Sequence, residues 1–181
     1  MGADYQELLA ECSQPLGAIG LLRRHRGYLE LLPSLRRLET SLVTILLPLV
    51  SMPRPAGPTY SALPCEVALL PCDPTWQVKM DQEILLFLHR PGEDLSDLLG
   101  RWRETQTILS QPYTWVMPPQ HQHMHNEGSE RVYPLFVLWP ATPGRIRRGL
   151  QGSGLPCVVW EERPADLSSP EAEVAPDGER T

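Results

Sequence analysis

The chain has 181 residues, of which 41% are hydrophobic and 21% are charged, a balance typical of a compact domain with appendages. The formal net charge is −6, and residues 161–181 carry −5 of it, which leaves −1 for the other 160 residues. A nearly neutral body attracts a polyanion weakly, so we expect no general binding of nucleic acid.

The first 51 residues predict a helical segment. Tyr5, Leu8 and Cys12 follow one another at steps of three and four residues, which indicates the apolar face of a short helix. Pro15 suits the first turn of a second helix. After Pro33, steps of three and four residues recur and predict a further helix. Its apolar stripe consists of Leu35, Leu38, Leu42, Ile45 and Leu49.

Such a stripe is stable only where something covers it, because apolar surface left in water is costly. The cover is either the rest of this chain or another protein, which includes a second copy. The helical segment carries more apolar surface than two or three short helices can readily bury alone. The sequence therefore favours docking on a partner.

A proline-rich stretch at 52–61 is expected to be a linker, because proline disfavours both helices and strand pairing. The acidic stretch at 161–181 is expected to be a disordered tail. These boundaries divide the chain into a helical segment at 1–51, the linker, a domain at 62–160 and the tail.

The 62–160 domain is expected to mix strands and helices. The predicted elements are strands at 66–70, 75–80 and 84–88, a helix from Asp94 or Ser96 to about Leu109, strands at 113–117 and 132–139, one or two helical turns at 144–151, and a strand at 155–160. Pro134 lacks an N–H, so one edge of the 132–139 strand should be unpaired near its start. We expect an α+β fold, with a mixed or antiparallel sheet and one main covering helix.

The most pointed chemical feature is the His-Gln-His-Met-His segment at 121–125. Alternate residues of an extended backbone share one face, which would bring His121, His123 and His125 together. Three imidazoles suit zinc or copper, and a nearby methionine, glutamate or cysteine would supply a further ligand. The alternatives are a polar surface loop that happens to be rich in histidine, or a loop that changes charge at about pH 6.

A basic cluster at Arg23, Arg24 and Arg26 is the second feature. It is either a solvated face opposite the leucines or a contact for phosphate or an acidic partner. Contact with RNA through the same arginines is a third hypothesis.

Signatures of catalysis and export are weak. The sequence contains neither a Gly-x-Ser-x-Gly elbow nor a phosphate-binding glycine loop, so an enzyme is not favoured. Four isolated cysteines are too few for a disulfide scaffold, although a Cys65–Cys72 bridge stays open. Acidic residues near the start argue against a signal peptide, and the longest apolar run is far below the ~20 residues that cross a bilayer. We expect a soluble protein of the cytoplasm.

The sequence thus favours a non-enzymatic interaction, adaptor or regulatory module that docks through its leucine-rich segment on another protein or on itself. The alternative is a transition-metal-binding protein, which includes a metal-dependent enzyme, with zinc or copper held by His121, His123 and His125. No other cofactor is expected.

Overall fold

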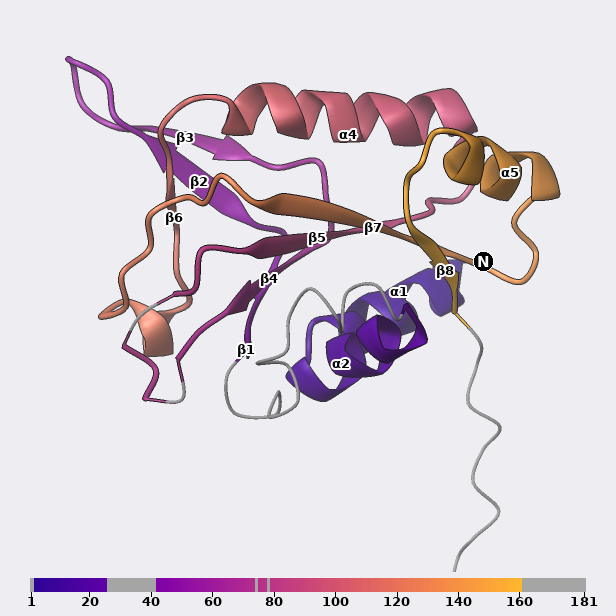
Figure 1. Ribbon diagram of the computed structural model, residues 1–181, viewed down its shortest axis with the longest axis horizontal. Helices are drawn as coiled ribbons and strands as arrows, with labels where there is room; N and C mark the ends of the chain where they lie inside the picture. Colours follow the sequence, from indigo (N-terminus) through magenta and orange to yellow (C-terminus); the bar gives the residue numbers. More distant parts are fainter. Residues whose placement is uncertain (1, 26–41, 74, 78, 161–181) are drawn as a thin grey trace, which may run out of the picture.

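The computed structural model describes residues 2–25, 42–73, 75–77 and 79–160. A five-stranded mixed sheet forms the middle layer and has the order β1-β4-β5-β7-β8 (Figure 1). The strands are β1 (Leu42–Leu46), β4 (Val67–Pro71), β5 (Glu83–Leu88), β7 (Val132–Leu138) and β8 (Cys157–Val159). Strand β4 is antiparallel to both of its neighbours, β1 and β5, whereas β5, β7 and β8 run parallel to one another.

Helices cover both faces of this sheet. Helices α1 (Gly2–Cys12) and α2 (Pro15–Arg24) lie on one face, and α4 (Leu95–Leu109) and α5 (Gly144–Gly152) lie on the other (Figure 1). Two hydrophobic clusters result, one under each pair of helices. This explains why β4 and β5 are buried along their whole length.

A second, three-stranded antiparallel sheet has the order β3-β2-β6. Its strands are β2 (Leu49–Met52), β3 (Thr59–Ala62) and β6 (Thr114–Trp115), and a short 3-10 helix, η2 (Pro119–His121), follows β6. Leu47 and Pro48 form the corner at which the chain leaves the first sheet for the second. The two sheets therefore meet where β1 ends and β2 begins.

Local sequence signals explain the helix ends. Asp94 caps α4 in a reciprocal capping box with Asp97, which satisfies backbone N–H groups of the first turn. Gly154, at a φ of 69°, occupies the left-handed region after α5, as expected for a glycine that ends a helix. Gly149 leaves room for the side chain of Leu95, so α5 can approach α4 closely. None of the helices in the described ranges is long and apolar enough to cross a bilayer.

The α+β class and the mixed sheet are confirmed, as are the two N-terminal helices and most elements after residue 62. Strand β8 pairs with β7 only from Phe136 onwards, so the missing N–H of Pro134 interrupts no ladder with β8, as predicted.

The helix predicted through Leu42, Ile45 and Leu49 is wrong, because these residues belong to β1 and β2. Val43, Thr44 and Ile45 form a β-branched run that favours a strand. Pro48 then breaks helical periodicity, and pairing with β4 decides the outcome.

Two further predictions need correction. The 52–61 stretch is not an unpaired linker, because β2 and β3 pair across it in a hairpin that starts at Met52 and Thr59. Its prolines lie in the exposed tip, where no ladder hydrogen bond is lost. The strand predicted at 75–80 is not formed either. Only an isolated bridge joins Cys72 to Lys79, and Trp76 has a left-handed backbone.

Some predictions fall on residues outside the described ranges. These are the stripe residues Leu35 and Leu38, the cluster residue Arg26 and the acidic stretch at 161–181.

Candidate functional site

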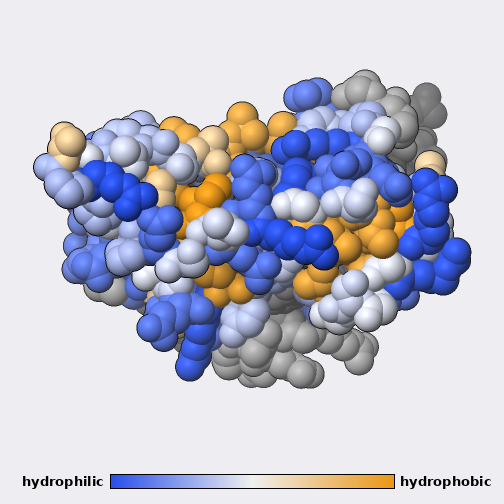
Figure 2. Space-filling model, turned by 90° about the horizontal axis from the view of Figure 1, so that it is seen from above, coloured by the Kyte–Doolittle hydropathy of each residue, from blue (hydrophilic) through white to orange (hydrophobic). Residues whose placement is uncertain are grey.

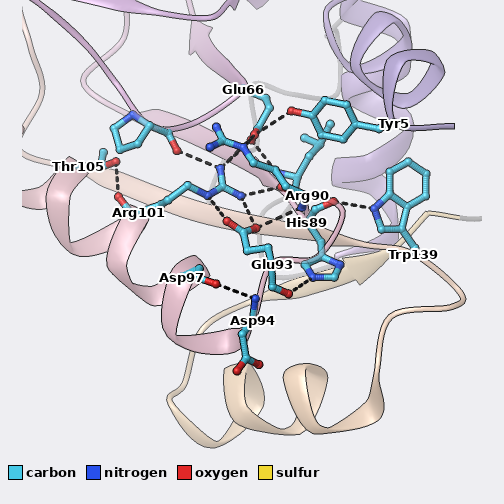
Figure 3. Close-up of polar contacts among 12 residues, drawn as sticks. Tyr5, Glu66, His89, Arg90, Glu93, Asp94, Asp97, Arg101, Thr105 and Trp139 are labelled. Carbon is cyan, nitrogen blue, oxygen red and sulfur yellow. Dashed lines mark hydrogen bonds and ion pairs between the residues drawn. The ribbon is translucent and has the colours of Figure 1, made fainter. Parts of the chain in front are cut away.

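Glu66 is a fully buried carboxylate at the centre of a polar network (Figure 3). Arg101 Nη1 donates to its two oxygens at 3.0 and 3.2 Å, and Arg90 Nε donates to Oε1 at 2.9 Å. The Tyr5 hydroxyl donates to Oε1 at 3.1 Å, and the backbone N–H of Leu88 donates to Oε2 at 2.8 Å. Burial, followed by the charge of Glu66, raises the pKa of Tyr5 and keeps its hydroxyl a donor.

Arg101 completes this network from α4. Its Nε and Nη2 hold the Glu93 carboxylate, each at 2.8 Å. Nη1 and Nη2 also donate to the backbone carbonyls of Pro64 at 3.0 Å and Leu88 at 2.7 Å. We call Glu66, Arg90, Glu93 and Arg101 the Glu66 cluster. Its two carboxylates balance two guanidinium groups, and every nitrogen of Arg101 donates to a protein oxygen, so the cluster is built for stability.

Glu83 is the second fully buried carboxylate. It accepts from the Tyr113 hydroxyl at 2.7 Å, Trp115 Nε1 at 2.6 Å, the backbone N–H of Ser129 at 3.1 Å and Lys79 Nζ at 3.0 Å. Burial, followed by the charge of Glu83, raises the pKa of Tyr113. Glu83 thus joins β5 to the segments beside it. Because four donors from the protein already surround its carboxylate, Glu83 has little capacity left to bind a ligand.

Exposed apolar side chains gather in a groove of about 510 Å³, which we call the β1 groove. It is lined by the α1–α2 turn at 13–15, by β1 and the chain that continues to Leu49, by Trp76 and by the 116–121 segment. Seven large apolar side chains of the described residues are exposed, and four of them line this groove: Leu46, Leu47, Leu49 and Val116. Leu47 alone is 62% exposed. Gathered apolar exposure of this kind marks interaction sites.

Backbone strain concentrates at the same groove. Leu47 has a φ of 47° and Trp76 a φ of 57°, and they are the only non-glycine residues with positive φ among those described. Left-handed backbone costs a residue with a Cβ about 1–2 kcal/mol. Strain of this kind persists where the surroundings impose it, and it gathers at functional sites.

Specific hydrogen bonds impose this strain. The backbone N–H of Leu47 donates to the carbonyl of Glu66 at 2.8 Å, which holds the corner after β1. Asp73 accepts from the backbone N–H groups of Thr75 at 3.1 Å and Gln77 at 2.8 Å, and so fixes the loop that carries Trp76. The fold thus holds a leucine and a tryptophan at the groove at a conformational cost.

The histidine segment lies beside this groove. His121 stacks on Trp76, with ring centroids 4.9 Å apart, and the His123 Nε2 lies 2.8 Å from the carbonyl oxygen of Trp76. His125 lines a different, smaller pocket. The extended backbone predicted here is wrong at its start, because Pro118 and Pro119 open the 3-10 turn η2.

Among the described residues, no group of three or more His, Cys, Asp and Glu side chains is arranged to hold a metal ion. Metal binding through His121, His123 and His125 stays a prediction. Burial, followed by the charge of His123, lowers the pKa of His121, so its ring is neutral at pH 7. The buried Nδ1 of His121 has no hydrogen-bond partner among the described residues.

The other predicted site residues are spread over the molecule. Leu42 and Ile45 are buried and Leu49 is exposed, and all three line the β1 groove. Arg23 and Arg24 lie exposed in the last turn of α2, where Arg24 Nη1 donates to the carbonyl of Val159 at 3.3 Å. All four cysteines are free thiols, so the Cys65–Cys72 bridge is not formed.

Figure 2 shows the face that carries α4, where hydrophilic residues predominate and hydrophobic residues show between them. Exposed side chains of α4 there include Arg103 and Glu104. This face provides a reference surface for experiments on the groove.

Sequence reasoning missed Leu46, Leu47, Trp76 and Val116 as groove residues. One signal was present, because a residue before proline is biased away from helix, and Leu47 precedes Pro48. No local pattern shows that the 13–15 turn and the 116–121 segment lie beside β1, because only the tertiary fold brings these segments together.

Comparisons of this chain with protein family models, with curated proteins and with solved structures give no match. The inference of function therefore rests on the groove and on the two buried carboxylate networks.

Proposed function

We propose that the protein is a non-enzymatic interaction module that docks another protein in the β1 groove. The observation that carries this proposal is the coincidence of exposed leucines and backbone strain at one place. Three of the stripe residues, Leu42, Ile45 and Leu49, belong to the same groove. Leu42 and Ile45 are buried in the protein's own core, so of these three only Leu49 offers exposed apolar surface, and a strand presents it in place of a helix.

The distribution of charge supports docking over catalysis. Catalytic carboxylates and bases need access to substrate and a proton to give or accept. Glu66 and Glu83 are instead fully buried and surrounded by donors from the protein. The groove in turn offers apolar area, which suits association by burial from water.

Site-specific photo-crosslinking in the native host tests the proposal. A photoreactive residue is placed at Leu47 or at Val116, and a matched reporter is placed at Glu104 on α4. We expect the two groove positions to yield one shared, identified protein partner, and we expect Glu104 to yield none of it. The outcome against docking is a product formed within a single chain, or equal yields at all three positions.

Metal binding is the second candidate, favoured by the buried Nδ1 of His121, which has no hydrogen-bond partner in the part of the chain that the structure describes. His121 and His123 both contact Trp76, so copper bound there should quench tryptophan fluorescence. Titration of untagged protein with zinc or copper, beside a His121→Ala/His123→Ala variant, tests it. Equal metal content in the two proteins would remove the candidate.

A further inference from the structure

The outer edge of β1 directs backbone groups into the groove. Along a strand, N–H and C=O groups point to alternate sides. All five residues of β1 lie opposite residues of β4, and the N–H of Leu47 bonds to the carbonyl of Glu66. Because hydrogen-bonded and non-hydrogen-bonded pairs alternate along an antiparallel ladder, Val43 and Ile45 are the residues of β1 whose backbone groups face β4. The N–H and C=O groups of Thr44 and Leu46 therefore point outward. Among the described residues, no strand pairs with this outer edge of β1.

The groove runs along this edge, because residues from both faces of β1 line it. On one face, the Thr44 hydroxyl donates to the carbonyl of Ser13 at 2.8 Å, which holds the α1–α2 turn beside the strand. On the other face, Ile45 packs in the same hydrophobic cluster as Met117. The strand edge is thus the floor of the groove, and the 13–15 turn and the 116–121 segment form its two sides.

The chemistry of the lining selects the occupant. None of the described residues that line the groove is Asp, Glu, Lys or Arg. The one histidine of this lining, His121, stacks on Trp76. A charged side chain buried there would lack a counter-charge, whereas an uncharged one would contact Leu46, Leu47 and Val116. The lining also includes polar side chains, such as those of Gln14 and Gln120, so the groove complements an uncharged segment that carries both apolar and hydrogen-bonding side chains.

We propose that the groove binds an extended, uncharged segment of a partner protein, which adds to the main sheet as a sixth strand along the outer edge of β1. This inference rests on the proposed function and specifies its partner. Strand addition gives affinity through backbone hydrogen bonds and specificity through alternate side chains. A second copy of the chain fits less well, because its own β1 would bring the same two projecting sides.

A peptide pair tests this mode of binding. The probe is a short acetylated and amidated peptide of alternating threonine and valine. Its matched control is the depsipeptide with the same side chains, in which ester oxygens replace the amide N–H groups. We expect the depsipeptide to bind about tenfold more weakly, because backbone donors are lost. In amide hydrogen exchange, the probe should protect Thr44 and Leu46 and leave Val43 and Ile45 unchanged.

A protein variant pair provides an independent test. Thr44→Pro removes the outward N–H and leaves the β4 ladder intact, as proline does on edge strands. Thr44→Val removes only the hydroxyl. Because both variants lack the hydroxyl and only Thr44→Pro also lacks the outward N–H, we expect Thr44→Pro to bind the peptide at least about tenfold more weakly than Thr44→Val. The peptide pair decides the matter if Thr44→Pro does not fold.

The outcomes distinguish strand addition from docking in general. Equal binding of peptide and depsipeptide, with cross-links still formed at Leu47, would overturn strand addition and keep the proposed function. No peptide binding while the partner still cross-links at Leu47 would also overturn it. Loss of both signals would overturn the proposed function itself.

Discussion

The Glu66 cluster and the β1 groove show two opposite uses of the same fold. In the cluster, Glu66, Glu93 and Arg101 have buried side chains, Arg90 is partly exposed, and each of the four charged groups finds a partner at hydrogen-bond distance. In the groove, large apolar side chains are exposed, and two residues hold a left-handed backbone. The two regions share a residue, since the backbone carbonyl of Glu66 accepts from the N–H of Leu47 while its carboxylate belongs to the cluster.

The residues of the Glu66 cluster therefore stabilise the fold, whereas Leu47 and Trp76 in the β1 groove hold a strained backbone that lowers stability. Changes in the cluster should act on stability and reach the partner only through it. Changes in the groove should act on the partner and leave stability nearly unchanged. Experiments that measure both quantities for each variant can sharpen or break this division.

The largest effect is expected from Arg101→Met. It leaves the buried Glu66 with Arg90 as its one remaining guanidinium and leaves Glu93 without its bidentate partner. We expect the free energy of unfolding to fall by about 3–5 kcal/mol, as for other broken buried ion pairs. Denaturant unfolding measures this loss. Arg103→Met, on the exposed side of the same helix, should change it by less than about 0.5 kcal/mol.

Tyr113→Phe should have a smaller effect of the same kind. It removes the hydroxyl that donates to Glu83 at 2.7 Å and keeps the ring against Gly128. We expect a loss of about 2 kcal/mol, typical of a hydrogen bond to a charged group. The exposed Tyr60→Phe serves as the control in the same unfolding assay. Equal stability of the two variants would show that Glu83 does not depend on this donor.

Local sequence signals predict most elements of the fold but not the β1 groove. Capping at Asp94, the proline at the start of α2 and the apolar runs of β5 and β7 are local signals, and each correctly predicted its element. The leucine spacing from Leu35 to Leu49 is also local, yet it fits a helix as well as two strands with a corner. Pairing with β4 decides between them, and pairing is not local.

The candidate site was predicted in part for the same reason. Leu42, Ile45 and Leu49 were identified because they are apolar and regularly spaced. Leu47 and Trp76 matter through positive φ and through their meeting at the groove, and neither property has a pattern in the sequence. The buried pairing of Glu66 with Arg101 spans 35 residues and was equally invisible.

Alkaline pH offers a further test of the buried core. Burial, followed by the charge of Asp73, raises the pKa of Cys72 from its ordinary 9.0 to about 11. A raised pKa favours the protonated folded state, so this stability is fully present below pH 9 and is lost as the pH rises through about 11.

Between these values the free energy of unfolding should fall more steeply in the native protein than in Cys72→Ala, by about 1 kcal/mol per pH unit. Unfolding curves of both proteins, measured at intervals of pH, give the two slopes. Parallel slopes would mean that the Cys72 thiol is not shielded from water.

Leu47→Asn is the measurement that tests the central claim most directly. Asparagine accepts the left-handed backbone better than leucine does but removes the apolar side chain. We expect the free energy of unfolding to stay unchanged or to rise by up to about 1 kcal/mol. With the photoreactive residue at Val116, the yield of the partner cross-link should fall about tenfold. A cross-link of undiminished yield from an equally stable Leu47→Asn protein would contradict docking in the groove.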